Sequence, residues 1–263
     1  MKPSRLRFLI PLLGWLMLAH AHAQTAAAPV AAGMPSMPVT EPDALQPFIA
    51  TYQVFNNGRQ LGDATLQLVA NDGNRWRIDL LMKGHGLMRL TGLNVQQSTV
   101  FERNGQSWRP LSQSTLRRVG FSSRKSTGVY DWNGRQARWS GDIKPHRAGP
   151  VALRDGDLSG LLINLAVIRD AQPGKALHYR FVDGGRIKEH AYQVAPDTEA
   201  IQVGELRYDA MRVDRVQGGG ENTTLWVASG VPTPIRILQR ENSDDSSGQD
   251  STDLRLIQYQ GVP

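Results

Sequence analysis

Apolar residues recur at every second position over most of this chain from residue 48 onward, with polar residues between them. Alternation of this kind is typical of antiparallel strands that bury one face and expose the other. The first three such segments carry their apolar residues at Ala50, Tyr52 and Val54, then at Ala64, Leu66 and Leu68, then at Trp76, Ile78, Leu80 and Met82. The chain is therefore expected to build a sheet from successive hairpins.

Turn dipeptides fall between the expected strands. Five of them supply the positive φ angles that tight hairpins need: Asn57-Gly58, Asp72-Gly73, Asn104-Gly105, Asn133-Gly134 and Gly184-Gly185. Six further expected strands follow in the second half of the chain: LHYRFV, IKEHAYQV, LRYDAMRVDRV, TTLWVA, IRILQR and DLRLIQY. No internal repeat and no second domain boundary interrupt this series.

Residues 155–174, DGDLSGLLINLAVIRDAQPG, form the one long stretch with a helical period. Asp157 is the expected N-cap, and Pro173-Gly174 is expected to end the helix. A single apolar stripe runs along it: Leu158, Leu161, Leu162, Leu165 and Ile168. The expected fold is therefore mainly β: a curved antiparallel sheet, open β-barrel or clam of about ten or more strands, with one helix packed in its concavity.

Two stretches interrupt the alternation. Residues 83–94, KGHGLMRLTGLN, form either a wide turn whose leucines cover the core or a mobile lip over an apolar cavity. Residues 116–127 alternate too poorly to indicate which side chains face inward.

The beginning of the chain has the features of a secretory signal peptide. Basic residues Lys2, Arg5 and Arg7 introduce an apolar run that reaches Leu18, and residues 21–23, Ala-His-Ala, have the small-x-small form of a cleavage site. The run is shorter than the roughly 20 residues of a membrane-spanning helix, which is the alternative interpretation.

Three regions are expected from this pattern. Residues 1–23 are a signal peptide, residues 24–47 an Ala/Pro-rich flexible tether, and residues 48–263 a single β-rich domain. The protein is expected to be periplasmic or secreted. The chain has no cysteine, so disulfides, thiolate sites and a lipoprotein acyl anchor are not expected, and no stable membrane anchor should remain after cleavage.

The charge distribution is uneven. The whole chain carries a formal charge of +6, and without the three basic residues of the expected signal peptide it carries about +3, which is too small to indicate a nucleic-acid-binding protein. Residues 109–147 nevertheless hold nine Arg or Lys against Asp131 and Asp142. This basic segment indicates anionic partners such as phospholipid or lipopolysaccharide head groups, or else the solvent-facing side of exposed strands. The candidate contact residues are Arg117, Arg118, Arg124 and Lys125.

Histidines and serines do not form a recognisable catalytic or metal-binding motif. Of the histidines after the signal, only His178 and His190 could lie close together, because the turn at Gly184-Gly185 is expected to join the two strands that carry them. No serine lies in a Gly-x-Ser-x-Gly elbow, and no phosphate-binding glycine loop is present. We expect no metal site and no cofactor.

Asp155 and Asp157, near the start of the expected helix, resemble a paired-carboxylate site, and Ser159 is expected to be a polar residue of the first helical turn. Helix capping and interaction with the helix dipole explain the two carboxylates at least as well. No catalytic residue is therefore predicted.

A ligand cavity beside the helix is the remaining candidate site. Tryptophans on expected strands either fill the core or line a pocket for an apolar ligand. The candidate lining residues are Leu158, Leu161, Leu162, Leu165, Trp76 and Trp132.

The order of several motifs resembles that of an exported bacterial family of unknown function. These motifs are YQVFNNGRQLGDATL, WRP, YDW, GDLSGLLINLAVIRD, PGK and TLWVASGVPTPIRI, and they span roughly residues 48 to 260. The resemblance implies a periplasmic β-rich protein with a central Asp-x-Ser helix and no assigned reaction, and it supplies no catalytic residues. At the level of the fold, the expected architecture also resembles the β-clam of lipoprotein carriers.

The expected function is therefore non-catalytic: a periplasmic protein that binds an apolar or amphiphilic envelope ligand, such as a lipid, or supports envelope maintenance. Two alternatives stay open. The protein is a scaffold that binds another envelope protein through a sheet edge or the basic segment 109–147, or it is a hydrolase acting on envelope polymers.

Overall fold

The structure, a computed structural model, describes residues 45–85, 94–218, 221–241 and 251–262, without the side chains of Glu221 and Glu241. These residues belong to one compact unit. The expected signal peptide, nearly all of the expected tether and most of the expected lip lie outside the described residues. Within the described part of the chain, no helix is long and apolar enough to cross a membrane.

Fourteen strands form one sheet within the described residues. They are β1 (Phe48–Asn56), β2 (Arg59–Ala70), β3 (Arg75–Gly84), β4 (Asn94–Asn104), β5 (Ser107–Val119), β6 (Ser122–Asp131), β7 (Gln136–Gly141), β8 (Val151–Ala152), β9 (Ala176–Asp183), β10 (Arg186–Val203), β11 (Leu206–Gln217), β12 (Glu221–Ala228), β13 (Arg236–Glu241) and β14 (Ser251–Gly261). A short 3₁₀ helix, η1 (Pro145–Arg147), and one α-helix, α2 (Gly160–Asp170), complete the described elements.

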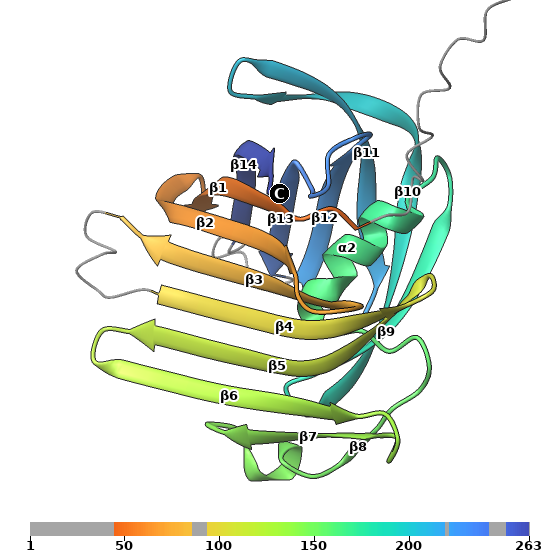
Figure 1. Ribbon diagram of the computed structural model, residues 1–263. Helices are drawn as coiled ribbons and strands as arrows, with labels where there is room; N and C mark the ends of the chain where they lie inside the picture. Colours follow the sequence, from red (N-terminus) through yellow and green to blue (C-terminus); the bar gives the residue numbers. More distant parts are fainter. Residues whose placement is uncertain (1–44, 86–93, 219–220, 242–250, 263) are drawn as a thin grey trace, which may run out of the picture. The chain divides into compact units, whose positions relative to one another are not determined.

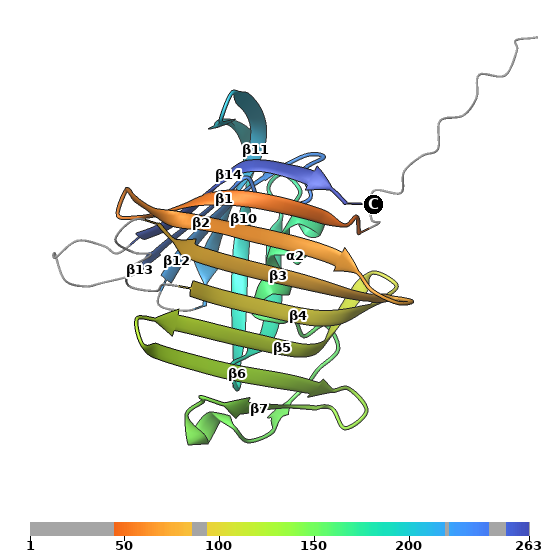
Figure 2. The same cartoon turned by 60° about the vertical axis from the view of Figure 1, so that its left-hand side comes forward.

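The strands are arranged in a nearly closed, barrel-like antiparallel sheet around α2 (Figures 1 and 2). Their order is β8-β7-β6-β5-β4-β3-β2-β1-β14-β13-β12-β11-β10-β9, so the first and last strands pair in the middle of the sheet. The two edge strands, β8 and β9, are consecutive in the sequence and flank the helix. The expected fold class, mainly β with one helix in the concavity, is confirmed.

All five turn dipeptides join consecutive strands as expected. Asn57 and Gly58 adopt φ angles of 48° and 77°, which are the positive values of a tight hairpin. Two further hairpins, β5–β6 and β10–β11, were not predicted from the sequence; their turns contain Gly120 and Gly204 with φ angles of 58° and 57°. Neither glycine has a turn-forming residue beside it, which explains why the dipeptide pattern did not identify them.

The alternation of the first strands corresponds to one buried face. Leu66, Ile78 and Phe101 are at most 3% exposed and pack in the core that contains α2, and we call this side of the sheet the inner face. Tyr52 lies on the same face, and its hydroxyl donates to the Pro234 carbonyl at 2.8 Å. Thr233 also contacts this hydroxyl. Period 2 therefore identified the core side of the first strands correctly.

The helix begins later than expected. It starts at Gly160 with Ser159 in the N-cap position, and Asp157 is not the N-cap. The Asp157 carboxylate instead accepts from the backbone N–H of Arg154 at 2.8 Å and pairs with Arg180. Because this carboxylate is held outside the helix, the first turn forms two residues further along.

Leu158 is also outside the helix, although it was assigned to the helical stripe. It forms a parallel bridge with Phe181 of β9, and its backbone N–H donates to Arg180 O at 3.1 Å. At the other end, α2 stops at Asp170 with Ala171 as the C-cap, before Pro173-Gly174. Of residues 155–174, only Gly160–Asp170 is therefore helical.

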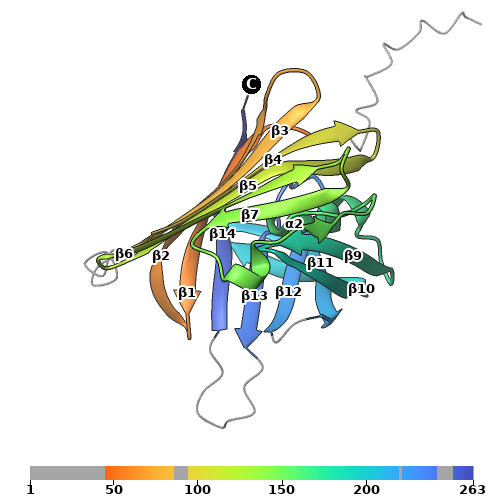
Figure 3. The same cartoon turned by 90° about the horizontal axis from the view of Figure 1, so that it is seen from below.

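The remaining helix is apolar on more than one side. Its buried residues are Leu161, Leu162, Ile163, Leu165, Ala166 and Val167. A helix with apolar residues around most of its circumference needs protein on several sides. Accordingly, α2 packs against β3, β4 and β9 inside the sheet (Figure 3). The expectation of a single buried stripe was wrong because the sheet curves around the helix.

Candidate functional site

Polar side chains close the gap between the two ends of the sheet. Tyr130 of β6 donates its hydroxyl proton to the Val182 carbonyl of β9 at 2.6 Å. Gln113 of β5 donates to the Asp183 carboxylate of β9, and the hydroxyls of Thr99 and Ser159 lie 3.0 Å apart. We call these residues the seam, because side chains here replace the backbone ladder that joins the other strands.

The most buried charge near the seam is Asp157. Its side chain is 1% exposed, and that of its partner Arg180 is 15% exposed. Burial, together with the negative charges of Asp183 and Asp157, raises the pKa of Tyr130 well above its usual value. Tyr130 is therefore a permanent hydrogen-bond donor at neutral pH, and the seam is a set of mutually satisfied polar groups.

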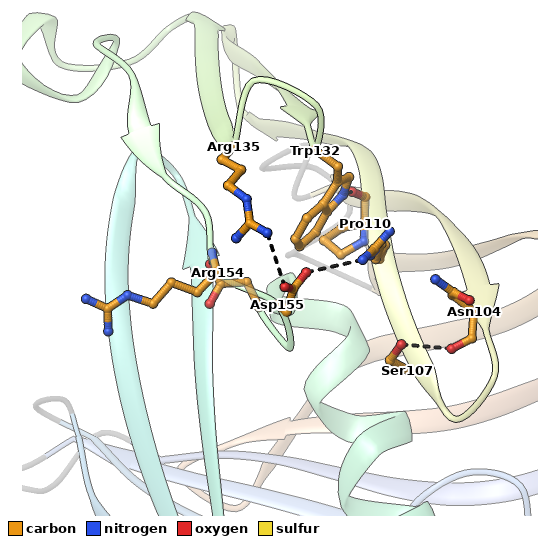
Figure 4. A network of polar contacts seen from close by, with 9 residues as sticks. Asn104, Ser107, Pro110, Trp132, Arg135, Arg154 and Asp155 are labelled. Carbon is orange, nitrogen blue, oxygen red and sulfur yellow. Dashed lines mark hydrogen bonds and ion pairs between the residues drawn. The ribbon is translucent and has the colours of Figure 1, made fainter.

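Asp155 and Asp157 do not form a paired-carboxylate site. The Asp155 side chain is 63% exposed and lies 3.2 Å from Arg109 and 3.5 Å from Arg135, at the solvent side of the loop before α2 (Figure 4). Asp157 is directed into the protein toward Arg180. Each carboxylate is held by arginine, so neither is available as a general acid or base in this arrangement.

The six candidate lining residues do not share one cavity wall. Leu158, Leu161, Leu162 and Leu165 are buried in the main core, with Trp76 packed against it. Trp132 belongs to a second cluster near β7, where its Nε1 donates to the Pro110 carbonyl at 2.7 Å. None of the six lines any of the three cavities described below.

His178 and His190, the pair that could have met across the Gly184-Gly185 turn, do not face each other. His190 is paired with Tyr179 and His178 with Ala191, so the pleat directs the two rings to opposite faces. Both contribute to a pocket of about 250 Å³ that spans β9 to β11. Within the described ranges, no group of three or more His, Cys, Asp or Glu side chains is placed to hold a metal ion.

His190 is a buried imidazole without a full set of partners. It is 6% exposed, packs edge-on against Phe181 with ring centroids 4.5 Å apart, and its Nε2 has no hydrogen-bond partner. Burial, and the positive charges of Arg215 and Lys188, lower the pKa of His190 to about 4. The ring is therefore neutral at physiological pH.

This lowered pKa predicts a pH-dependent stability. The unfolded chain binds a proton at His190 below about pH 6.5, whereas the folded protein does not until about pH 4, so acidification favours unfolding. We expect protonation of His190 in the unfolded chain to lower the free energy of unfolding by about 2 kcal/mol between pH 7 and pH 5. Urea unfolding at both pH values should show a smaller loss in His190→Asn than in the wild type. The exposed His178→Asn serves as the control, and an unchanged pH dependence in His190→Asn would contradict the assignment.

A small cavity on the inner face is lined by residues of β1, β2, β3, β4, β5 and β14. It measures about 180 Å³. Val54, Met82 and Val95 belong to its apolar part, and its polar lining residues are Asn56, Asp63, Lys83, Arg117 and Thr252. We call Val54, Met82, Val95, Arg117 and Thr252, together with Arg124 opposite Arg117, the mouth.

The four basic residues singled out in the sequence are divided between the two faces. Arg117 lies directly opposite Arg124 and, on its other side, opposite Val95, so both arginines share the inner face of the mouth. Arg118 and Lys125 each follow one of these arginines in the sequence, so their side chains lie on the opposite, outer face of the sheet. All four are exposed, and none has a carboxylate within salt-bridge distance among the described residues.

The outer face carries a larger polar groove of about 800 Å³. Amides and hydroxyls dominate its lining, which includes Gln67, Gln96, Ser98 and Ser114. Arg118, Ser123 and Lys125 form its basic end, and Asp79 is the one carboxylate among its described lining residues. Neither the mouth nor this groove could be predicted from the sequence, because strand residues from distant hairpins form both.

Comparison with solved structures finds two barrel-like proteins of low sequence identity. A β-barrel-like protein of domain of unknown function DUF1849 from Brucella abortus has a TM-score of 0.46 and 11% identity, covering 83% of this chain and 99% of its own. A DUF1089 family protein from Pseudomonas aeruginosa has a TM-score of 0.36 and 13% identity, covering 70% of this chain and 88% of its own. No curated protein matches the chain significantly.

The model of one protein family matches residues 50–245, which is most of the chain. The match indicates no catalytic family. It confirms the resemblance to a β-rich family of unknown function that the order of the motifs suggested. The chain belongs to the family described as protein of unknown function DUF3108.

Proposed function

We propose that this protein is a non-catalytic binding protein for an amphiphilic anion, with the mouth as its binding site. The observation that carries the proposal is the position of Arg117, which lines a partly apolar cavity and lies directly opposite Arg124 of β6. Within the described residues, neither arginine has a carboxylate at salt-bridge distance. The apolar end of the ligand lies against Val54, Met82 and Val95, and its anionic head group lies between the arginines.

Electrostatics supports an anion at this place. Like charges directly opposite each other on neighbouring strands destabilise a sheet, and no described carboxylate relieves the pair. A carboxylate or phosphate accepts two parallel hydrogen bonds from a guanidinium, which suits arginine better than lysine. A bound anionic head group therefore removes the repulsion and satisfies the donors of both side chains.

The size of the cavity supports a partly enclosed ligand. About 180 Å³ is less than the roughly 300–1,000 Å³ of sites that enclose a whole drug-sized molecule. Only the apolar end of an amphiphile fits inside, while its head group remains at the rim. Fatty acids and anionic phospholipids have this division, which fits a role in envelope maintenance if the expected export takes place.

The test is ligand binding by the exported protein. Native mass spectrometry should reveal copurified fatty acid or phospholipid, and a fluorescent fatty acid should bind in titrations. Because each charge-assisted hydrogen bond contributes about 1.5–3 kcal/mol, we expect Arg117→Ser/Arg124→Ser to weaken binding at least tenfold. Arg118→Ser/Lys125→Ser removes the same charge from the outer face and should bind the fatty acid normally. Equal losses in both double variants, or no uptake by the wild type, would refute the assignment of the mouth.

A further inference from the structure

The β5–β6 hairpin ends in two exposed apolar residues. Val119 pairs with Ser122, so the turn between them consists of Gly120 and Phe121. Gly120 has a φ angle of 58°, which suits the first central position of a two-residue turn. Val119 is 46% exposed and Phe121 is fully exposed, so the described residues leave the phenyl ring open to solvent.

Basic residues flank this turn on both strands. Arg118 precedes Val119, Lys125 follows on β6, and the two lie on the outer face of the hairpin. No acidic residue occurs in the sequence between Glu102 and Asp131. We call Arg118, Val119, Phe121 and Lys125 the tip, which combines exposed apolar side chains with unopposed positive charge.

The other newly recognised hairpin has an exposed apolar residue in a different charge environment. At the β10–β11 turn, Leu206 is 61% exposed and follows Gly204, so the backbone and the apolar exposure are similar. Glu205 lies in that turn, and Arg207 and Asp209 follow on β11. An exposed apolar residue alone is common on protein surfaces. At the tip the nearby charges are all positive, whereas at the β10–β11 turn charges of both signs lie together.

We propose that the tip docks on the surface of an anionic lipid bilayer. Phe121 and Val119 enter the interfacial region, where aromatic and aliphatic side chains leave water without reaching the bilayer centre. Arg118 and Lys125 contact lipid phosphates, and their long apolar stems allow the charged ends to stay at the level of the head groups. Contact through so few residues is weak, reversible and sensitive to salt.

Docking at the tip also orients the mouth. Arg117 precedes Arg118, and Arg124 precedes Lys125, so a docked tip holds the rim of the mouth next to the lipid head groups. Transfer of an amphiphile between bilayer and mouth rests on the proposed function. Docking itself does not, because it needs only the four residues of the tip.

The experiment is flotation of the exported protein with vesicles. The wild type should float with vesicles of phosphatidylethanolamine and phosphatidylglycerol at about 0.1 M salt, and should not at about 1 M salt or with pure phosphatidylcholine. Each cation near an anionic surface contributes about fivefold in affinity. The affinity of Arg118→Glu/Lys125→Glu for anionic vesicles should therefore be at least about 25-fold lower than that of the wild type. The affinity of Phe121→Ser for these vesicles should be about tenfold lower than that of the wild type.

Matched variants control for charge and exposure. Arg75→Glu/Arg207→Glu changes the net charge equally at two exposed sites, and Leu206→Ser removes an exposed apolar residue from the other hairpin. Both should float like the wild type. The proposal is overturned if the wild type does not bind anionic vesicles, if it binds phosphatidylcholine equally, or if these controls lose as much as the tip variants. Fatty-acid titrations separate the two proposals, because tip variants should still bind a soluble ligand and mouth variants should not.

Discussion

Asp157→Asn is expected to lower the free energy of unfolding by about 3–5 kcal/mol, because it removes one partner of a buried ion pair. The Asp157 side chain is 1% exposed and Arg180 is 15% exposed, so the guanidinium would be left with an uncompensated charge in a poorly solvated place. Asparagine has nearly the same shape and still accepts from the Arg154 backbone, which confines the change to the charge. Thermal unfolding should show a decrease of about 10 °C in Tm.

Asp155→Asn is the matched control for this experiment. Asp155 also contacts arginines, but its side chain is 63% exposed and its partners lie at 3.2 and 3.5 Å. Solvent screens such a pair, so the expected loss is below about 1 kcal/mol. A loss below about 1 kcal/mol for Asp157→Asn, or equal losses in the two variants, would show that the buried pair does not stabilise the seam.

Leu162→Ala is expected to lower the free energy of unfolding by about 2–5 kcal/mol, since Leu162 is 0% exposed in the first turn of α2. The helix lies between the two halves of the sheet, so the space left by the removed methyl groups has walls on several sides and collapses little. Denaturant unfolding monitored by circular dichroism gives the change in free energy directly.

Asn164→Ala provides the comparison on the same helix. Asn164 is only partly buried, and alanine has the higher helix propensity, so this variant should be neutral or slightly stabilising. If Leu162→Ala costs less than about 1 kcal/mol, the side chain is not packed as tightly as its burial indicates, and an interior cavity beside α2 would return as a candidate ligand site.

The strands could be predicted because their signals are local. Tyr52, Leu66 and Ile78 are all buried on the inner face, as period 2 requires, and Asn133-Gly134 is one of five turn dipeptides that each join two strands. A pleated strand and a tight turn depend on a few neighbouring residues, so a single sequence contains enough information for them.

The start of the helix could not be predicted, because a residue distant in the sequence determines it. Asp157 is a suitable N-cap by its chemistry, yet Arg180 of β9 holds its carboxylate. Leu158 has the right spacing for the stripe, yet it bridges to Phe181 of the same strand. Tertiary contacts with β9 therefore override the local preference at this end of the helix.

The division of the basic residues depends on one turn. Arg117 and Arg124 share a face only because Gly120 and Phe121 form a two-residue turn, since a shift of one position would exchange the faces. Residues 116–127 carry no hydrophobic alternation that would reveal this register. The candidate contact residues were therefore identified as a group, but their separation into mouth and tip required the structure.

The pairing of β1 with β14 determines the order in which this sheet is completed. Asn56 donates to the Ser251 carbonyl across a separation of 195 residues, whereas most other neighbours in the sheet are joined by local hairpins. Contacts between such distant residues slow folding, and an unpaired strand edge is a template for pairing with other chains. A chain that emerges N-terminus first therefore keeps one edge of its first strand open until its last strand arrives, and this interval is its period of greatest exposure to aggregation.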